Sequence, residues 1–314
     1  MIFALLGAPA LLPCPVLPAC RHRSRSATMQ LQIVTDIDDT IKSSGGVTLA
    51  GIPLGGVDTS FQRNAVYPGV FQFATELAYG ASGFGRQPAK VAVLTARAEE
   101  FRWALEIRQT DKICVGFRRA GEAQGIKGWG IGPVLYGSVQ EWICQERKGW
   151  RKFENFKKLQ AAAERKRQRY LFIGDNGSSE KDLEAAEMII SHSPRALRAV
   201  FLHAVSGDQQ PAPLPEDHVI EGVPVRYFRT YASAAAKAAQ LGLLGNVGAR
   251  RVLDAVEADM RDDPVNVAVG SANERLLLQE LADARASLGM GITLANWRQR
   301  LRLPGQRSTS RVRT

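Results

Sequence analysis

The stretch LQIVTDIDDTIKSSG, residues 31–45, joins a short apolar run to three aspartates within four residues. The run LQIVT (31–35) is nearly continuous in apolar residues, as is typical of a strand covered on both faces. Asp36, Asp38 and Asp39 follow it directly, and carboxylates packed this closely repel one another. The pattern therefore predicts a buried strand that ends in a polar site where something offsets the negative charge.

Five more runs of the same kind follow along the chain, separated by longer segments with helical periodicity. The predicted strands are KVAVLT (90–95), PVLYG (133–137), RYLFIG (169–174), RAVFLH (198–203) and VRYF (225–228). The predicted helices cover roughly 69–79, 98–109, 138–146, 152–167, 180–191 and 231–241. This alternation predicts an α/β fold with a parallel sheet, helices on both faces and a ligand site at the carboxyl ends of the strands.

Two regions depart from the alternation. Residues 41–67 are Gly-rich and without clear periodicity, so we expect a small insertion or loop over the strand ends. After Gly245, Ala- and Leu-rich helical patterns predict a C-terminal extension. The expected organisation is a transit, signal or disordered segment (1–28), a catalytic domain (29–245), and a helical extension ending in a basic tail (246–314).

The net charge of +10 is concentrated at the two ends of the chain. Nine arginines lie in residues 1–28 and 297–314, which contain no acid, and the remainder holds 32 basic against 31 acidic residues. Basic tails of this kind are typically solvated. The near-neutral remainder offers no extended basic groove, so we expect no nucleic-acid partner.

The N-terminal segment is apolar, but its closely spaced prolines disfavour a membrane-spanning helix. An organelle transit peptide, a weak secretory signal and a true start at Met29 all remain open. Cys114 and Cys144 are read as reduced residues in or near the core of an intracellular protein. The expected location is cytoplasmic, or organellar if residues 1–28 are a transit peptide.

Three kinds of local site could account for aspartates placed in this way. An EF-hand loop fails, because its fifth, sixth and twelfth positions hold Thr40, Ile41 and Val47. Helix capping by Asp39 or Thr40 leaves the other two acids unexplained. A phosphoryl-transfer site explains Asp36 as the nucleophile and Asp38 as the general acid and base. A divalent cation would offset their charge and hold the phosphate.

That chemistry requires partners at the ends of other strands. Thr95 ends one predicted strand and could bond a phosphate oxygen, and Asp175 ends another and could bind the cation. Lys152, between them in the chain, is the candidate for stabilising charge on the transferring group. Each residue alone has a commoner structural role, but their order, each after an apolar strand, favours the joint explanation.

This ordered set resembles the haloacid dehalogenase (HAD) superfamily, whose first motif is Asp-x-Asp-x-Thr/Val. More narrowly, TDIDDTIKSSG, YPGVFQFATEL, FIGDNG, AVFLHAV and VRYFRTYASAAAKAAQLGLL resemble the phosphatidate phosphatase catalytic domain of the fungal actin-patch protein family. The resemblance spans about residues 31–245. It implies a HAD-like, Rossmannoid fold and an aspartyl-phosphate intermediate on Asp36.

The resemblance also implies a ligand set. Mg²⁺ would be held by Asp36, the backbone carbonyl of Asp38, Asp175 and a further acid, for which Asp182 fits better than Glu180. Lys152 fits better than Lys148, Lys157 or Lys158. Thr40, Arg97 and Asn176 are expected to contact the substrate.

The substrate is less well specified than the reaction. A lipid phosphate such as phosphatidate is expected from the resemblance, and a soluble phosphomonoester is the alternative. A phosphotransferase and a non-catalytic scaffold of the same fold are the other hypotheses. Residues 147–169 hold ten basic residues against two acids, with Trp150, Phe153 and Phe156 between them. This segment could lie on an anionic membrane, or be a solvated helix with its aromatic residues turned inward.

Overall fold

The computed structural model describes residues 31–49, 52–53, 55–82, 87–101, 107–138, 140, 144–163, 168–177, 181–205, 207 and 213–290. The predicted segment 1–28, the basic tail, Glu180, Cys14 and Cys20 lie outside the described residues.

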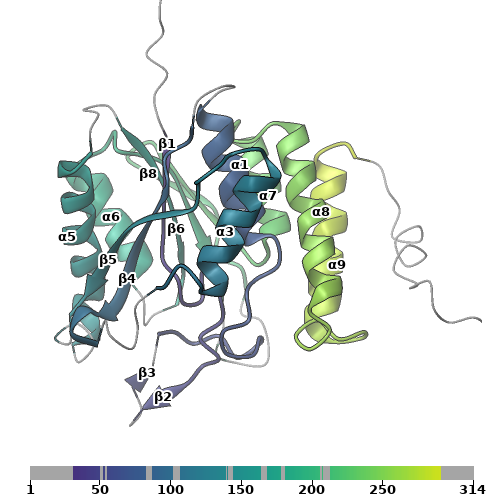
Figure 1. The fold of residues 1–314 in the computed structure, drawn as a ribbon, viewed down its shortest axis with the longest axis horizontal. Coiled ribbons are helices and arrows are strands. Elements are labelled where there is room, and N and C mark those ends of the chain that lie inside the picture. Colours follow the sequence, from purple (N-terminus) through teal and green to yellow (C-terminus); the bar gives the residue numbers. More distant parts are fainter. Residues whose placement is uncertain are drawn as a thin grey trace, which may run out of the picture.

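A seven-stranded sheet forms the centre of the molecule, in the order β5-β4-β1-β6-β7-β9-β8 (Figure 1). Its strands are β1 (Leu31–Thr35), β4 (Val91–Ala98), β5 (Ile131–Gly137), β6 (Arg169–Asp175), β7 (Leu197–His203), β8 (His218–Ile220) and β9 (Val223–Phe228). All neighbouring strands are parallel except β8, which runs antiparallel to β9. The predicted α/β fold is confirmed.

Strand β1 marks the point where the strand order reverses. From β1 the chain builds β4 and β5 on one side, then returns to place β6 on the other. Thr35 is in register with Val93 of β4 and with Ile173 of β6. In open parallel sheets such a switch point leaves a crevice outside the carboxyl ends of the strands. The residues that follow β1 and β6 therefore meet at one place.

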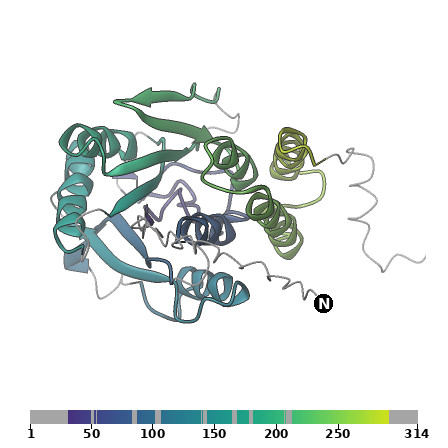
Figure 2. The same ribbon diagram turned by 90° about the horizontal axis from the view of Figure 1, so that it is seen from above.

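Helices cover both faces of the sheet (Figure 2). Helices α1 (Val70–Ser82), α3 (Lys112–Ala123) and α7 (Tyr231–Gln240) share a core with Ile33 and Val93. Helices α5 (Lys148–Ala161) and α6 (Asp182–His192) share a second core with Val34 and Ala92. Successive strand residues point to opposite faces. Because both faces are buried, the strands read as continuous apolar runs.

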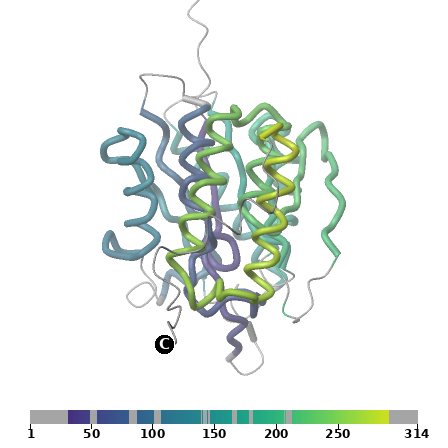
Figure 3. The backbone as a smooth tube through the Cα atoms, turned by 90° about the vertical axis from the view of Figure 1, so that its right-hand side faces the viewer, coloured from purple at the N-terminus to yellow at the C-terminus, as the bar shows by residue number. Residues whose placement is uncertain are grey.

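Helices α8 (Asn246–Asp262) and α9 (Ala272–Ser287) form a third layer outside α1 and α7 (Figure 3). Their apolar residues join the same core as α1, among them Val252, Val256, Leu277 and Leu281. The predicted C-terminal helices are therefore present. They extend the hydrophobic core rather than standing apart from it.

The predicted insertion after β1 lies beyond the carboxyl ends of the strands (Figure 1). It includes a short antiparallel pair, β2 (Thr48–Leu49) and β3 (Ile52–Pro53). Tyr67 returns to the base of the insertion, where its backbone N–H donates to the carbonyl of Ile41. The insertion is thus anchored at both of its ends.

The helix predicted over 98–109 is wrong in its described part. Strand β4 continues to Ala98, the 3₁₀ turn η1 (Glu99–Phe101) follows, and the helix α3 begins at Lys112. Two glycines of α3 lower its helix propensity. Both lie in close packing, since a Cβ on Gly116 would collide with the ring of Phe71, and one on Gly121 would lie 3.0 Å from Trp129.

Of the helix predicted over 138–146, residues 139 and 141–143 lie outside the described residues, and the 3₁₀ turn η2 (Gln145–Arg147) covers its end. Helix α5 begins earlier than predicted and ends earlier, at Ala161. Cys114 is buried in α3 as expected, but Cys144 is exposed, so its assignment near the core was wrong.

Candidate metal centre

Three aspartates meet at the switch-point crevice. Asp36 follows β1, Asp175 is the last residue of β6, and Asp182 is the first residue of α6. One carboxylate oxygen of each lies within 4.8 Å of the others. All three residues are at most 2% exposed. Buried carboxylates this close repel one another unless a cation or a shared proton offsets their charge, and their oxygen atoms could hold a hard divalent ion such as Mg²⁺.

Lys152 of α5 reaches into this cluster. Its Nζ lies 2.7 Å from Asp36 Oδ2 and 2.7 Å from Asp182 Oδ1. The second oxygen of Asp182 accepts the backbone N–H of Asp175 at 3.0 Å. The lysine therefore offsets two carboxylates, and Asp182 links the helix α6 to the end of β6.

Other lysines of α5 lie elsewhere. Lys157 pairs with Glu154, and Lys158 donates to Asn155 on the same helix. Lys148 is buried like Lys152. Lys152 contacts both Asp36 and Asp182 of the acidic cluster.

Glycines make the close approach of these elements feasible. A Cβ on Gly174 would lie 2.6 Å from Asp182 Cβ. The N–H of Gly177 donates to Asp175 Oδ1 at 2.6 Å, and a Cβ there would stand 2.6 Å from the same oxygen. The glycines of GDNG therefore do more than allow a turn, because they leave room for the carboxylates.

Asp38 does not join the triad with its side chain. Its carboxylate forms a bidentate pair with Arg97, with Nε–Oδ2 at 3.0 Å and Nη2–Oδ1 at 2.9 Å. Lys42 Nζ lies 3.6 Å from Asp38 Oδ1. Burial by itself raises the pKa of Asp38, but the charges and hydrogen bonds of Arg97 and Lys42 hold it below its usual value.

These charged groups lie closer to solvent than the triad does. The side chains of Asp38, Arg97 and Lys42 are 13%, 19% and 15% exposed, whereas Asp36 and Lys152 are at most 2% exposed. Two cations thus stand at the entrance of the site. Such a pair favours the arrival of an anion.

The remaining predicted residues lie nearby but face different groups. Thr95 is buried in β4, and its Oγ1 accepts the N–H of Arg97 at 3.2 Å. Asn176 Oδ1 accepts the N–H of Val205 at 2.9 Å. Thr40 is fully buried, and its hydroxyl has no hydrogen-bond partner among the described residues. In this arrangement Thr95 adjoins the entrance, whereas Asn176 joins the turns after β6 and β7.

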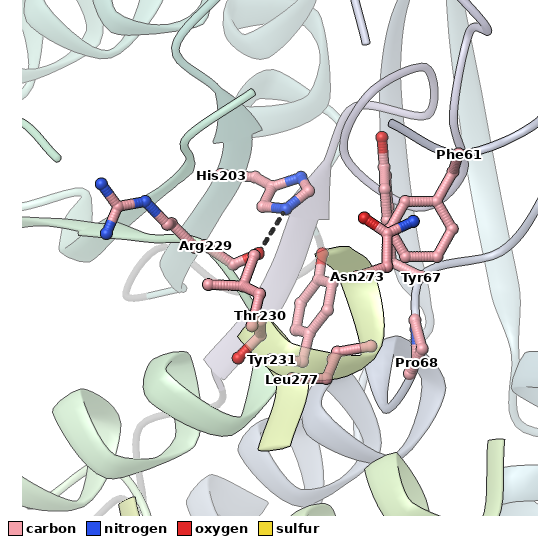
Figure 4. Close-up of a pocket in the computed structure, with 10 residues that line it drawn as sticks. Phe61, Tyr67, Pro68, His203, Arg229, Thr230, Tyr231, Asn273 and Leu277 are labelled. Atoms are coloured by element: carbon pink, nitrogen blue, oxygen red, sulfur yellow. Dashed lines mark hydrogen bonds between the residues drawn. The ribbon is translucent and has the colours of Figure 1, made fainter. Parts of the chain in front are cut away.

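His203 belongs to the surroundings of the site and was not singled out from the sequence. It ends β7, and one of its ring nitrogens lies 2.7 Å from the carbonyl oxygen of Asp39. The other lies 3.0 Å from the carbonyl oxygen of Arg229 (Figure 4). Its ring stacks on Phe228 and meets Tyr67 edge-on. A histidine at the carboxyl end of a strand was the available signal, and here it holds the turn after β1 in place.

A small pocket opens beside His203 (Figure 4), with a volume of about 20 Å³, enough for about one water molecule. Its walls come from the insertion, the ends of β7 and β9, and the helices α7 and α9. The lining residues are Phe61, Tyr67, Pro68, His203, Arg229, Thr230, Tyr231, Asn273, Leu276 and Leu277. No member of the acidic triad lines it, so the pocket and the candidate metal centre are separate.

No protein-family model matches the chain, and comparisons with curated proteins and with solved structures also found no match. The chemistry of the site therefore has to be inferred from its geometry. Among the described residues, no helix combines the length and the apolar character needed to cross a membrane.

Proposed function

We propose that this chain is a Mg²⁺-dependent phosphomonoesterase of the HAD type, acting through an aspartyl-phosphate on Asp36. The observation that supports it most is the buried triad of Asp36, Asp175 and Asp182 with Lys152, at the switch point of a parallel sheet. The resemblance of the motif around Asp36 to the HAD superfamily points the same way.

In this proposal Asp36 attacks phosphorus while the bond to the leaving oxygen breaks. Once the phosphate has taken Arg97 away, Asp38 would take up a proton and give it to that oxygen. As a carboxylate it would then take a proton from the water that hydrolyses the acyl phosphate. Asp36, Asp175 and Asp182, with the backbone carbonyl of Asp38, would hold Mg²⁺. When bound, the ion would offset charge on the phosphoryl group. Lys152 would stabilise the same charge from the α5 side.

Arg97 and Thr95 are the proposed phosphate contacts. Both oxygens of Asp38 are bound by Arg97 in this structure. A phosphate dianion arriving at the entrance would compete for the guanidinium, which binds phosphate in the same bidentate manner. Substrate binding would thereby release Asp38 for proton transfer.

The decisive experiment is Asp36→Asn. An amide cannot form the acyl phosphate, so Mg²⁺-dependent phosphate release should fall to background. EDTA should have the same effect on the wild-type protein. Asp262→Asn, at an exposed position on α8, is the matched control and should retain full activity. Undiminished release by Asp36→Asn would end the proposal.

A lipid phosphate such as phosphatidate is the proposed substrate, and one surface feature agrees with it. Trp150, in the first turn of α5, is 37% exposed, and the guanidinium groups of Arg147 and Arg151 lie 5.1 and 5.3 Å from its ring. Phe156, further along the helix, is fully buried. An exposed aromatic side chain between two cations suits an anionic lipid surface.

A phosphate-release panel would separate the substrate classes. It should contain phosphatidate and lysophosphatidate in mixed micelles, diacylglycerol pyrophosphate, and soluble sugar and nucleotide phosphates. Good turnover of the soluble esters with none of phosphatidate would reject the lipid hypothesis. Transfer of the phosphoryl group to an added alcohol would indicate a phosphotransferase instead. A non-catalytic scaffold would release no phosphate from any of them.

A further inference from the structure

Asp39 is the one aspartate of the three that the proposed chemistry does not use. It is fully buried, and its φ of 57° places it in the left-handed region. That conformation is uncommon for a residue with a side chain and persists where surrounding contacts hold it. The contacts of Asp39 with its neighbours must therefore hold it in this conformation.

Three backbone N–H groups of the insertion converge on its carboxylate. Oδ1 accepts from Ser44 at 2.8 Å, and Oδ2 accepts from Val57 at 2.6 Å and from Asp58 at 2.9 Å. Ser44 precedes the β2–β3 pair, and Val57 and Asp58 follow it. One carboxylate thus ties both ends of the pair to the turn that carries Asp36.

Residues 55–58, hereafter the covering segment, lie directly against the aspartates. A Cβ on Gly55 would lie 3.0 Å from Asp38 Oδ2, and one on Gly56 would collide with Asp39 Oδ2. Both glycines have positive φ angles, +100° and +154°, which a residue with a side chain rarely adopts. This close contact with the carboxylates requires glycine at both positions.

The covering segment reaches across to the neighbouring strands. Val57 Cγ2 is 3.5 Å from the position of a Cβ on Gly177, in the turn after β6. Beyond the segment, Thr59 Oγ1 donates to the carbonyl of Gly207 at 3.1 Å. The segment therefore runs from the turn after β1 to the turn after β6, next to the strand ends that carry Asp36 and Asp175. This cover is consistent with the burial of Asp36 and Asp175.

We propose that Asp39 is a positioning residue that fastens the covering segment over the triad and so limits the width of the leaving group that reaches Asp36. The limit on the leaving group rests on the proposed function, whereas the fastening does not. Narrow leaving groups pass the entrance beside Asp38, and wide ones meet the backbone of Gly55 and Gly56.

The fastening is tested by amide hydrogen exchange on the full chain. In the wild-type protein the amides of Ser44, Val57 and Asp58 should be strongly protected. In Asp39→Asn an amide nitrogen replaces one acceptor oxygen, and exchange at these amides should rise at least about tenfold, since hydrogen bonds to a charged carboxylate are stronger than those between neutral groups. Asp39→Ala removes every acceptor and should raise it further. Asp262→Asn should change none of them.

The width limit is tested with phenyl phosphate and 1-naphthyl phosphate, whose leaving groups share their chemistry and differ in width. The wild-type protein should favour the phenyl ester in kcat/KM, and Asp39→Asn should reduce that preference at least about tenfold. A purely structural role would lower kcat/KM for both esters equally and leave the preference unchanged.

The outcomes separate the two proposals. Unprotected amides of Val57 and Asp58 in the wild-type protein would overturn the fastening, and this measurement needs no variant to fold. Changed exchange with an unchanged preference would overturn the width limit. A wild-type protein that releases no phosphate from any ester would reject the proposed function and, with it, the width limit. The result on the fastening would stand.

Discussion

At the residue scale, Lys152 is the side chain that balances the charge of the candidate metal centre. Its Nζ contacts Asp36 and Asp182 at 2.7 Å each, in a setting that is almost fully buried. Removing one partner of a buried ion pair leaves an uncompensated charge and costs about 3–5 kcal/mol. The lysine therefore bears on both the stability of the fold and the proposed reaction.

We predict that Lys152→Met lowers Mg²⁺-dependent phosphate release at least about 10²-fold, the usual effect of losing one charge-stabilising group. It should also lower the melting temperature in EDTA, because Asp36 and Asp182 would repel each other unopposed. Added Mg²⁺ should then stabilise the variant more than the wild-type protein. Both effects are measured by thermal scans and phosphate release.

Lys157→Met is the matched control, since Lys157 pairs with Glu154 at the surface of the same helix. It should behave as the wild-type protein does. Equal activity and equal melting temperatures for Lys152→Met and Lys157→Met would contradict the role assigned to Lys152.

Some of these residues could be predicted from the sequence, and the reason is local. Asp36 and Asp175 directly follow apolar strands, so a parallel sheet brings them to one edge. Asp182 needed the resemblance, because its place depends on the length of the turn before α6. Asp38 and Asp39 lie in the aperiodic turn after β1, and Arg97 lies in β4 beyond the predicted end of that strand, so no local pattern gives their contacts. Their roles in catalysis stay predictions.

At the element scale, the joint between β6 and α6 sets the geometry of the triad. Strand β6 supplies Asp175, and α6 supplies Asp182 from its first position. The two elements approach closely because Gly174 has no side chain. The N–H of Asp175 completes the joint by donating to Asp182.

We predict that Gly174→Ala weakens Mg²⁺ binding. Its Cβ would lie 2.6 Å from the Cβ and Cγ of Asp182, so α6 must move away from β6. Overpacking of this kind typically costs about 1–3 kcal/mol. If this cost falls on the Mg²⁺-bound state, the Mg²⁺ concentration for half-maximal activity should rise about five- to hundredfold, since 1.4 kcal/mol is a factor of ten.

Gly245→Ala is a suitable control for that experiment, because a Cβ there meets nothing within 4 Å. Titration calorimetry with Mg²⁺ on both variants would report the binding directly. Unchanged Mg²⁺ affinity in Gly174→Ala would show that the joint tolerates the extra methyl group.

The elements themselves were predictable to different degrees. Strands buried on both faces give continuous apolar runs, and all six predicted strands are present. Helix α3 was not predicted, because Gly116 and Gly121 obscure its helical pattern. These glycines allow Phe71 and Trp129 to pack closely against the helix. Strands β2, β3 and β8 have two or three residues each. Segments so short hold too few residues to show a period.

At the scale of the whole molecule, α8 is fastened to α1. Arg251 forms a bidentate pair with Glu76 of α1, and Asp259 Oδ2 accepts the N–H of Gly69 at 2.8 Å. Gly69 has a φ of +86°, and a Cβ there would collide with Val256 of α8. The third layer is therefore fixed to the helices that cover the sheet.

The burial of Asp259 at this contact predicts how the stability of the protein depends on pH. Burial raises the pKa of Asp259, although the Gly69 hydrogen bond acts against the rise. A carboxyl group whose pKa is raised in the folded state contributes its full stabilisation at pH values below 3.8, the pKa that it has in the unfolded chain. That contribution is lost as the pH rises through the raised pKa of the folded state. Asp259→Asn cannot ionise, and its amide oxygen can still accept from Gly69.

The melting temperature of Asp259→Asn, relative to the wild-type protein, should therefore increase as pH rises from about 4 to about 7. Thermal scans across this range measure the difference. Asp283→Asn, at an exposed position on α9, provides the comparison and should follow the wild-type protein. A difference that is constant with pH would show that Asp259 has no raised pKa.

The fastening of the insertion to the third layer has a consequence for synthesis on the ribosome. The N–H of Gln62 donates to Asn266, 204 residues later, and the carbonyl of Ser60 accepts from Asn273, 213 residues later. At translation rates of about 5–20 residues per second, Asn266 and Asn273 are synthesised on the order of 10–40 s after Ser60 and Gln62. Asp36, Asp38 and Asp39 are synthesised long before the residues that hold the insertion in place. The complete site should therefore form only after α9 has left the ribosome.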